Sequence, residues 1–159
     1  MNAPSVALPA LAFPSSRRLR GRSAFDRVHR RGARAPTRDL TVLVHPSPSP
    51  HVRLGMAVSR KVGNAVVRNR LRRRIREIVR LHQAELPGWD LVVVARPTAA
   101  RLVDEPFDVL ARTLMAAIRQ ARQRARASTP GSPPAERPIP GPSLRPRADN
   151  GRPAQGRPR

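Results

Sequence analysis

The most constraining feature of this 159-residue chain is an arginine-rich segment that runs from Arg60 to Glu77. From Val67 onward its spacing predicts a helix, because at about 100° per residue the apolar and basic side chains separate onto opposite sides. The apolar side carries Val67, Leu71, Ile75, Ile78 and His82, and the other side carries Arg68, Asn69, Arg72, Arg73, Arg76 and Arg80. Glu77 is the only acid in this run, so we expect no local pairing to offset the repulsion between arginines. A merely solvated helix face would mix in glutamates, and the pattern therefore favours a polyanionic partner.

The composition of the whole chain points in the same direction. The formal net charge is +22, which is typical of a protein that binds nucleic acid. Lys61 is the only lysine among 32 basic residues, and arginine forks are suited to bidentate contacts with phosphate. The absence of cysteine excludes disulfides and cysteine-ligated zinc, and fits a cytoplasmic location. No apolar stretch is long enough to span a membrane, so we expect no membrane partner.

Three regions differ in composition. Residues 1–16 hold an apolar stretch interrupted by prolines and lacking a positive start, so we predict a flexible leader and no secretory signal. Residues 17–127 have the patterning of a single α+β domain. Residues 128–159 are rich in Pro, Gly, Ser and Arg and nearly free of large apolar side chains, so we predict a disordered tail.

Within the domain the elements alternate. A short helix is expected from an N-cap at Ser23 to Gly32, followed by strands at 40–44 and 52–58 on either side of a proline-rich loop. The arginine helix follows a tight turn at Gly63. A fully buried strand at 91–95 and a last helix after Asp104-Glu105-Pro106 complete the order α-β-β-α-β-α, with one further short strand near 34–36.

We find no residues placed for catalysis or metal binding. The acids are scattered, and the cluster of Asp104, Glu105 and Asp108 is better explained by the dipole at the start of a helix. The four histidines lack metal-ligand spacing, and no phosphate loop of the Walker type is present. Aromatic side chains make up only 3% of the chain, so base stacking is expected to be minor. The sequence predicts a phosphate-binding surface whose affinity falls with salt.

The positions that surround and fill the arginine segment resemble the signature of the bacterial ribonuclease P protein component. That family carries a run of the form R-x-G-x-x-V-S-[KR]-K-x-G-x-A-V-x-R-N-x-x-[KR]-R-x-x-R. This sequence meets it at Arg53, Gly55, Val58, Ser59, Arg60, Lys61, Gly63, Ala65, Val66, Arg68, Asn69, Arg72, Arg73 and Arg76. The resemblance extends from about residue 17 to the last helix and leaves both tails outside.

The resemblance implies a fold and an activity. The fold is an α-β-β-β-α-β-α sandwich around a central sheet, in which the arginine helix forms a left-handed β-α-β crossover. The activity is that of a protein subunit, a monomer in a 1:1 complex with a large catalytic RNA, that assists removal of the 5′ leader from precursor tRNA. Mg²⁺ is required by the whole enzyme and is held mainly by the RNA.

The resemblance also implies site residues. Contacts with the catalytic RNA are implied at Arg60, Lys61, Asn64, Arg68, Asn69, Arg70, Arg72, Arg73 and Arg76. A cleft for the leader is implied between the first helix and the sheet, lined by Phe25, His29, Thr41, Leu43 and Ala57. His29 and Leu43 stand where relatives often carry aromatic side chains. Arg74 lies at the edge of the basic arc, and we expect its stem to be buried along the apolar seam, outside the RNA contacts.

Two other functions remain open at this point. A structural RNA-binding protein, such as a small ribosomal protein, would share the charge and the tails. A nuclease that uses its own metal ion would instead need a carboxylate such as that of Asp104. Copurification with ribosomal subunits would favour the first, and cleavage by RNA-free protein would favour the second.

Overall fold

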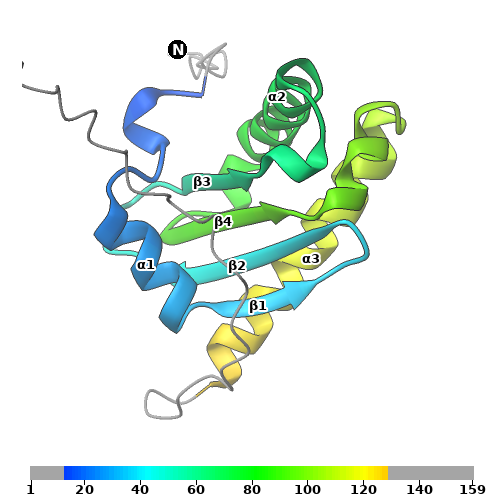
Figure 1. The fold of residues 1–159 in the computed structure, drawn as a ribbon. Helices are drawn as coiled ribbons and strands as arrows, with labels where there is room; N and C mark the ends of the chain where they lie inside the picture. Colours follow the sequence, from blue (N-terminus) through cyan, green and yellow to red (C-terminus); the bar gives the residue numbers. More distant parts are fainter. Residues whose placement is uncertain (1–12, 129–159) are drawn as a thin grey trace, which may run out of the picture.

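A four-stranded mixed sheet, in the order β1-β2-β4-β3, organises the computed structural model, which describes residues 13–128 (Figure 1). The helices are α1 (Arg22–Arg31), α2 (Ala65–Leu81) and α3 (Phe107–Ala127), and the strands are β1 (Ala33–Pro36), β2 (Leu40–Pro46), β3 (Arg53–Val58) and β4 (Trp89–Ala95). Short 3₁₀ helices add η1 (Ser15–Arg17), η2 (Arg60–Val62), η3 (Gln83–Glu85) and η4 (Pro97–Val103). The order α-β-β-β-α-β-α is confirmed. The predicted tail, apart from Ser128, lies outside the described residues.

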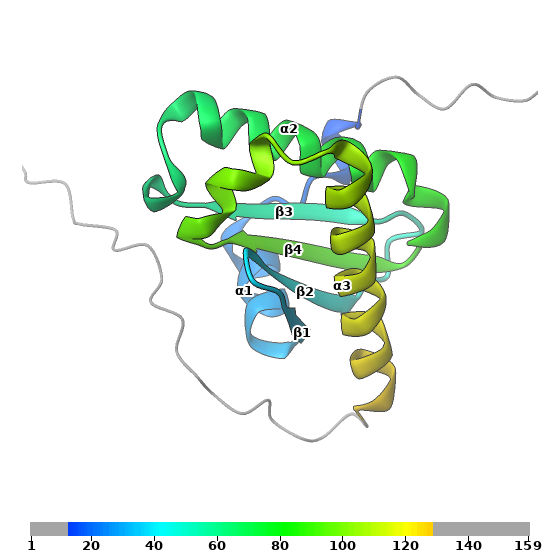
Figure 2. The ribbon, with the colours of Figure 1, turned by 90° about the vertical axis from the view of Figure 1, so that its right-hand side faces the viewer.

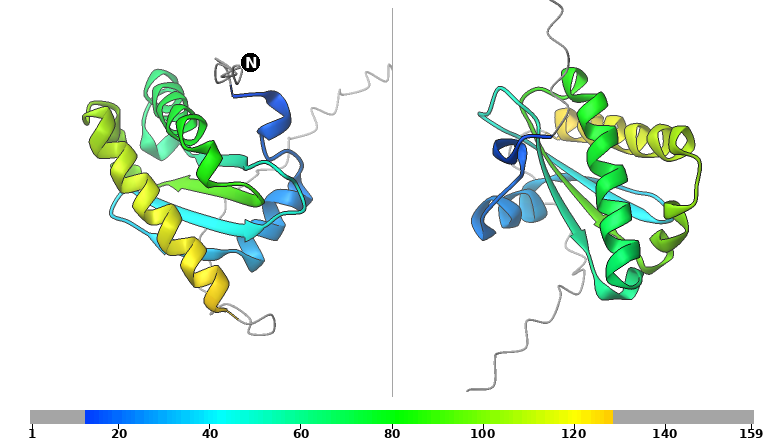
Figure 3. Two further views of the ribbon diagram at one scale, coloured as in Figure 1. Left: turned by 180° about the vertical axis from the view of Figure 1, so that it is seen from behind. Right: turned by 90° about the horizontal axis from the view of Figure 1, so that it is seen from above.

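The connection from β3 to β4 gives the sheet its unusual topology. These two strands are parallel neighbours, whereas β1 with β2 and β2 with β4 pair in antiparallel fashion. The chain crosses between β3 and β4 through α2, on the face of the sheet opposite α1, and the crossover is left-handed (Figures 1 and 3). The general preference is for right-handed crossovers. The family resemblance therefore predicted a hand that the periodicity of the sequence could not.

The sheet is buried on both faces because alternate residues of its central strands point to opposite sides. One face packs under α2 and α3 in a large core (Figure 2), whose members include Val42, Leu91, Ile75, Leu114 and Ile118. The other face packs under α1 in a smaller cluster of Leu19, Val28, Leu43 and Val92. The continuous apolar run of β4 is explained by this double burial, as the sequence predicted.

Element boundaries differ from the prediction at three places. Phe13 is only 6% exposed in the large core, so the folded domain begins within the segment assigned to the leader. The N-cap of α1 is Gly21, not Ser23, because the chain turns at Gly21 with a φ of 84° that favours glycine. The arginine helix begins at Ala65, two residues earlier than expected, because Asn64 caps it.

Candidate nucleic-acid interface

The entrance to α2 is built by Gly63 of the sequence motif and by its neighbour Asn64. Gly63 has a φ of 151°, and a Cβ there would lie 3.2 Å from Cγ1 of Val67. Asn64 is the N-cap of α2, and its Oδ1 accepts a hydrogen bond from the backbone N–H of Val67 at 3.0 Å. Asn64, which the resemblance places among the RNA contacts, is exposed and also has this structural role.

A first group of cations points outward from α2 and the segment before it. Arg70 and Arg73 are exposed on α2, and Arg60 and Lys61 are exposed in η2. Within residues 13–128 their side chains make no hydrogen bond or ion pair with the protein. Asn69 is also exposed on this side, beside Val66, which is 69% exposed. This surface offers unpaired guanidinium groups around one apolar side chain.

A second group lies along the flank of α2 that faces the edge strand β3. Arg68, Arg72 and Arg76 are half-buried there. Arg72 donates to the carbonyl of Val58 at 3.2 Å and to Oδ1 of Asn69 at 3.2 Å. The Nε of Arg76 is buried without a partner among the described residues. Burial lowers the pKa of Arg76, and the positive charges of Arg18 and Arg72 lower it further.

Arg18 was not among the predicted site residues. Arg18 bridges to Leu54, and the next residue donates its N–H to the Leu54 carbonyl at 2.9 Å. This pairing places Arg18 at the edge of β3, near Arg76. The basic run at 17–20 was the only signal in the sequence, and it could not indicate which strand the run would meet.

Arg74 and Arg80 are occupied by the protein itself. Arg74 donates to the carbonyls of Leu102 (2.8 Å), Val103 (2.5 Å) and Glu105, and lies 6.0 Å from the ring centre of Phe107. The guanidinium of Arg74 is therefore occupied within the protein, and its place outside the RNA contacts stays a prediction. Arg80 corrects the expectation of no local pairing, because its Nη2 lies 2.6 Å from Oε1 of Glu77. The hydrogen bond from Arg80 lowers the pKa of Glu77.

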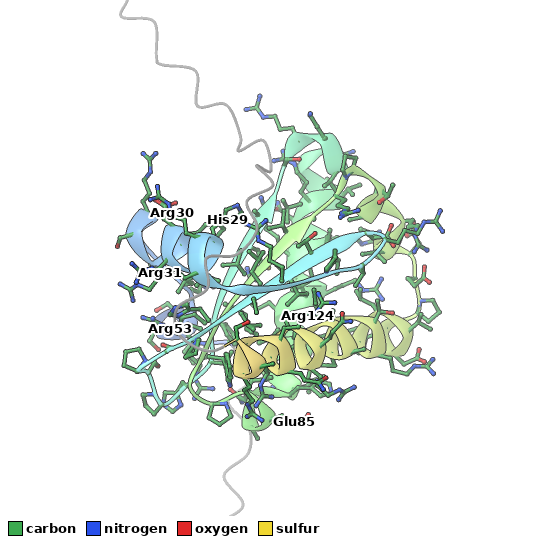
Figure 4. The ribbon with its side chains drawn as sticks, turned by 90° about the horizontal axis from the view of Figure 1, so that it is seen from below. His29, Arg30, Arg31, Arg53, Glu85 and Arg124 are labelled. Atoms are coloured by element: carbon green, nitrogen blue, oxygen red, sulfur yellow. The ribbon has the colours of Figure 1, made fainter. Side chains whose placement is uncertain are left out.

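The residues predicted to line a leader cleft lie on the other face of the sheet, beside α1. The Phe25 ring is half-buried over Gly55, where a Cβ would lie 3.0 Å from Cε2 of the ring. His29 follows one turn later, with ring centroids 6.4 Å apart and an angle of 18° between the rings. His29 faces the sheet, whereas Arg30 and Arg31 point outward (Figure 4). Burial and the charge of Arg34 lower the pKa of His29, which favours its neutral form.

Two of these predicted residues belong to a row in register across three strands. Thr41 pairs with Val94, and Val94 pairs with Ala57. Val94 and Ala57 are half-buried, and Thr41 is 7% exposed. Leu43 is completely buried under α1, which places it in the core and not on the cleft surface. Val94 was not predicted as a site residue, because the continuous apolar run at 91–95 predicted a strand that is buried throughout.

Two further motif residues maintain the fold. Arg53 donates from Nε and Nη2 to the two oxygens of Asp90 at 2.7 Å each. Asp90 is 1% exposed, so this bidentate pair satisfies a buried carboxylate. Gly55 leaves room for the Phe25 ring. The motif therefore combines residues that shape the site with residues that present charge to solvent.

The acids of the described domain form no metal site. Within residues 13–128 no group of three His, Cys, Asp or Glu side chains could hold a metal ion. Asp39 pairs with Arg101, and Asp108 occupies the first turn of α3, where it pairs with Arg112 at 3.0 Å. No helix among the described residues is long and apolar enough to cross a bilayer.

Comparison with known proteins identifies the family. The family model described as Ribonuclease P matches residues 13–122. The ribonuclease P protein component of Desulfovibrio desulfuricans is 44% identical over 113 residues, which cover 69% of this chain and 87% of the relative. The corresponding protein of Kocuria rhizophila is 41% identical over 113 residues, which cover 70% of this chain and 97% of the relative.

Solved structures agree with the sequence comparison. The RNase P protein of Staphylococcus aureus is 30% identical with a TM-score of 0.60, and the match covers 67% of this chain and 95% of that one. The RNase P protein of Thermotoga maritima is 28% identical with a TM-score of 0.57, and the match covers 70% of this chain and 98% of that one. These matches support the single α+β domain described above.

A mixed sheet with an arginine-rich helix on one face and the paired rings of Phe25 and His29 on the other defines a basic nucleic-acid-binding α+β protein. The chain belongs to the ribonuclease P protein family, and its function is that of the protein subunit of this tRNA-processing endoribonuclease. The family match implies a partnership with the ribonuclease P RNA. The alternative of a structural ribosomal protein is not favoured.

Proposed function

We propose that the outward side of α2 and the preceding η2 bind the phosphate backbone of the ribonuclease P RNA. The observation that carries this proposal is that the exposed side chains of Arg60, Lys61, Arg70 and Arg73 make no hydrogen bond or ion pair within residues 13–128. Phosphate oxygens would balance these charges and release counterions from the RNA. Arg68, Asn69, Arg72 and Arg76 extend the same surface toward β3.

The cleft beside α1 is the proposed site for the 5′ leader of precursor tRNA. Phe25 offers a half-buried ring for a base, and the row of Thr41, Val94 and Ala57 forms a narrow floor. His29, whose lowered pKa favours the neutral form, adds a second ring that favours stacking over phosphate pairing. Leu43 supports this site from below by packing under α1.

Hydrolysis is assigned to the RNA and not to this chain. Mg²⁺ needs oxygen ligands in octahedral geometry, and the described acids are engaged with arginines or stand apart. Within residues 13–128 the acids offer no such set of ligands for Mg²⁺. In this proposal one protein monomer joins one RNA in the cytoplasm, where precursor tRNA is made.

Reconstitution of the protein with its RNA tests the proposal. The protein should lower the Mg²⁺ concentration needed for cleavage and should tighten binding of leader-bearing over mature tRNA. Equal affinity for the two tRNAs would rule out the leader site. Cleavage by RNA-free protein, abolished by Asp104→Ala, would instead assign catalysis to the chain.

A further inference from the structure

A second basic surface lies on the C-terminal half of α3, and neither the RNA face of α2 nor the leader cleft includes it. A shallow pocket there is lined by Arg119, Arg122, Gln123 and Arg126. Arg119, Gln123 and Arg126 are exposed, and Arg122 is half-buried. Residues 109–128 contain no acid, so nothing on this half of the helix neutralises the arginines.

Arg122 is held in position by contacts from outside its own helix. Its Nη1 donates to the Glu85 carbonyl at 2.8 Å, and its guanidinium lies 5.5 Å from the ring centre of Trp89. Its Nε is buried and has no partner among the described residues. Burial and the nearby charge of Arg126 lower the pKa of Arg122, which the Glu85 carboxylate partly offsets. The pocket therefore contains one guanidinium that the fold holds in place, flanked by the exposed cations Arg119 and Arg126.

The place of this pocket in the fold indicates which RNA it meets. Helices α2 and α3 cover the same face of the sheet, and α1 covers the opposite face (Figures 2 and 3). An RNA seated on α2 can reach α3 without passing around the sheet, whereas a leader beside α1 cannot. Two other arginines of α3 already have partners within the protein. Arg112 is paired with Asp108, and Arg124 donates to the Arg34 carbonyl at 2.5 Å.

We propose that Arg119, Arg122 and Arg126 form a second phosphate-binding site that holds the backbone of the ribonuclease P RNA. This inference rests on the proposed function, in which α2 faces the same RNA. The ligand class is RNA phosphate, because three guanidinium groups around a pocket without acids complement phosphate oxygens in charge and in hydrogen-bond geometry.

Salt-dependent binding to the ribonuclease P RNA tests the site. The variant Arg119→Gln/Arg126→Gln leaves Arg122 and its packing on Trp89 intact, so the fold should be retained. Its affinity should fall roughly tenfold at 0.15 M salt, and the slope of log K against log salt should decrease by about two. Arg112→Gln removes one charge from the same helix outside the pocket and serves as the control. A double variant with the slope of the wild type, or with an effect no larger than that of Arg112→Gln, would overturn the inference.

Trp89 gives a readout that is local to the pocket, because the chain contains one tryptophan. Titration with the ribonuclease P RNA should change its emission, and Arg119→Gln/Arg126→Gln should shift that change to higher RNA concentration. Precursor tRNA alone should not give the change in the same concentration range. If precursor tRNA gives it and the ribonuclease P RNA does not, the assigned partner is wrong.

A variant of α2 separates this inference from the function on which it rests. Arg70→Gln/Arg73→Gln should weaken binding of the ribonuclease P RNA but leave the Trp89 change at saturation intact. If only this α2 variant weakens binding, the α3 site is wrong and the proposed function stands. If only the α3 variant weakens binding, the RNA contacts proposed for α2 are wrong and the α3 site is the one that remains.

Discussion

Helices α2 and α3 cover the same face of the sheet and are both rich in arginine, but they place their charges oppositely along the helix axis. The first turn of α2 has no acid and contains Arg68. The first turn of α3 contains Asp108, and its last turn contains Arg124 and Arg126. Positive charge is unfavourable near a helix N-terminus and favourable near a C-terminus. The charges of α3 therefore help its own helix, whereas those at the start of α2 oppose theirs.

This difference separates two reasons for the presence of an arginine: stabilising the fold and binding an external anion. Arginines that stabilise the fold have partners within it, as Arg74 has in three backbone carbonyls and Arg124 has in the Arg34 carbonyl. Arginines that lack such partners, such as Arg70 and Arg73, are instead explained by an external anion. Arg122 combines both features, because it has protein contacts and an unsatisfied Nε.

The largest expected effect lies on the buried side of α2. Ile75 is 0% exposed, and Ile75→Ala should lower the free energy of unfolding by about 2–5 kcal/mol through lost burial and the cavity left behind. Urea denaturation measures this change, with Arg73→Ala as the surface control on the same helix. Equal unfolding midpoints for Ile75→Ala and the wild type would contradict the helix orientation.

The next effect concerns the link between α2 and the start of α3. Arg74→Ala should lower the free energy of unfolding by about 1–3 kcal/mol, because it leaves partly buried carbonyls of η4 without donors and removes the contact with Phe107. Its effect on RNA affinity should be smaller than that of Arg73→Ala. If Arg74→Ala lowers the free energy of RNA binding more than the free energy of unfolding, the contrast between Arg74 and the outward arginines of α2 is wrong.

The outward side of α2 should behave in the opposite way. Arg73→Ala should weaken binding to the ribonuclease P RNA several-fold and reduce the salt slope by about one, because one phosphate contact is lost. The free energy of unfolding should stay within about 0.5 kcal/mol of the wild type, as for other exposed positions. Binding titrations and urea denaturation of the same preparation test both statements.

A pair of mirrored substitutions tests the dipole argument directly. Val66→Glu introduces an acid at an exposed site in the first turn of α2 and should raise the free energy of unfolding by about 0.3–1 kcal/mol. Asp108→Asn should lower it by a similar amount in α3. Val66→Glu should also weaken RNA binding, since it places a negative charge beside Arg70 and Arg73. Destabilisation by Val66→Glu would remove the contrast between the two helices.

The smallest effect is the pH dependence of the Glu77–Arg80 pair. The pKa of Glu77 is lowered by its hydrogen bond with Arg80, so the pair contributes stability above the ordinary glutamate pKa and loses it as pH falls through the lowered value. Glu77→Gln should therefore be slightly less stable than the wild type at pH 7, and the difference should shrink as pH falls below the ordinary glutamate pKa. Thermal unfolding over this pH range measures the difference, which should be small because both side chains contact solvent.

Much of the fold could be predicted because its signals are local. The apolar residues of α2 recur at helical spacing, so Leu71, Ile75 and Ile78 were placed correctly in the core. The burial of Phe13 could not be predicted, because its proline-interrupted surroundings carry no periodicity and its partners come from later in the chain. The hand of the crossover came from the family resemblance alone.

The features of the site likewise divide into those that the sequence determines and those that tertiary packing determines. The sequence by itself determined the excess of positive charge, the side of α2 that carries it and the motif shared with the ribonuclease P protein family. Only the tertiary structure decided which cations remain unpaired, because their partners lie far along the chain: 28 residues separate Arg74 from Leu102, and 37 separate Arg122 from Glu85. Helical periodicity specifies the direction of a side chain around its axis, but packing between distant segments specifies what that side chain meets.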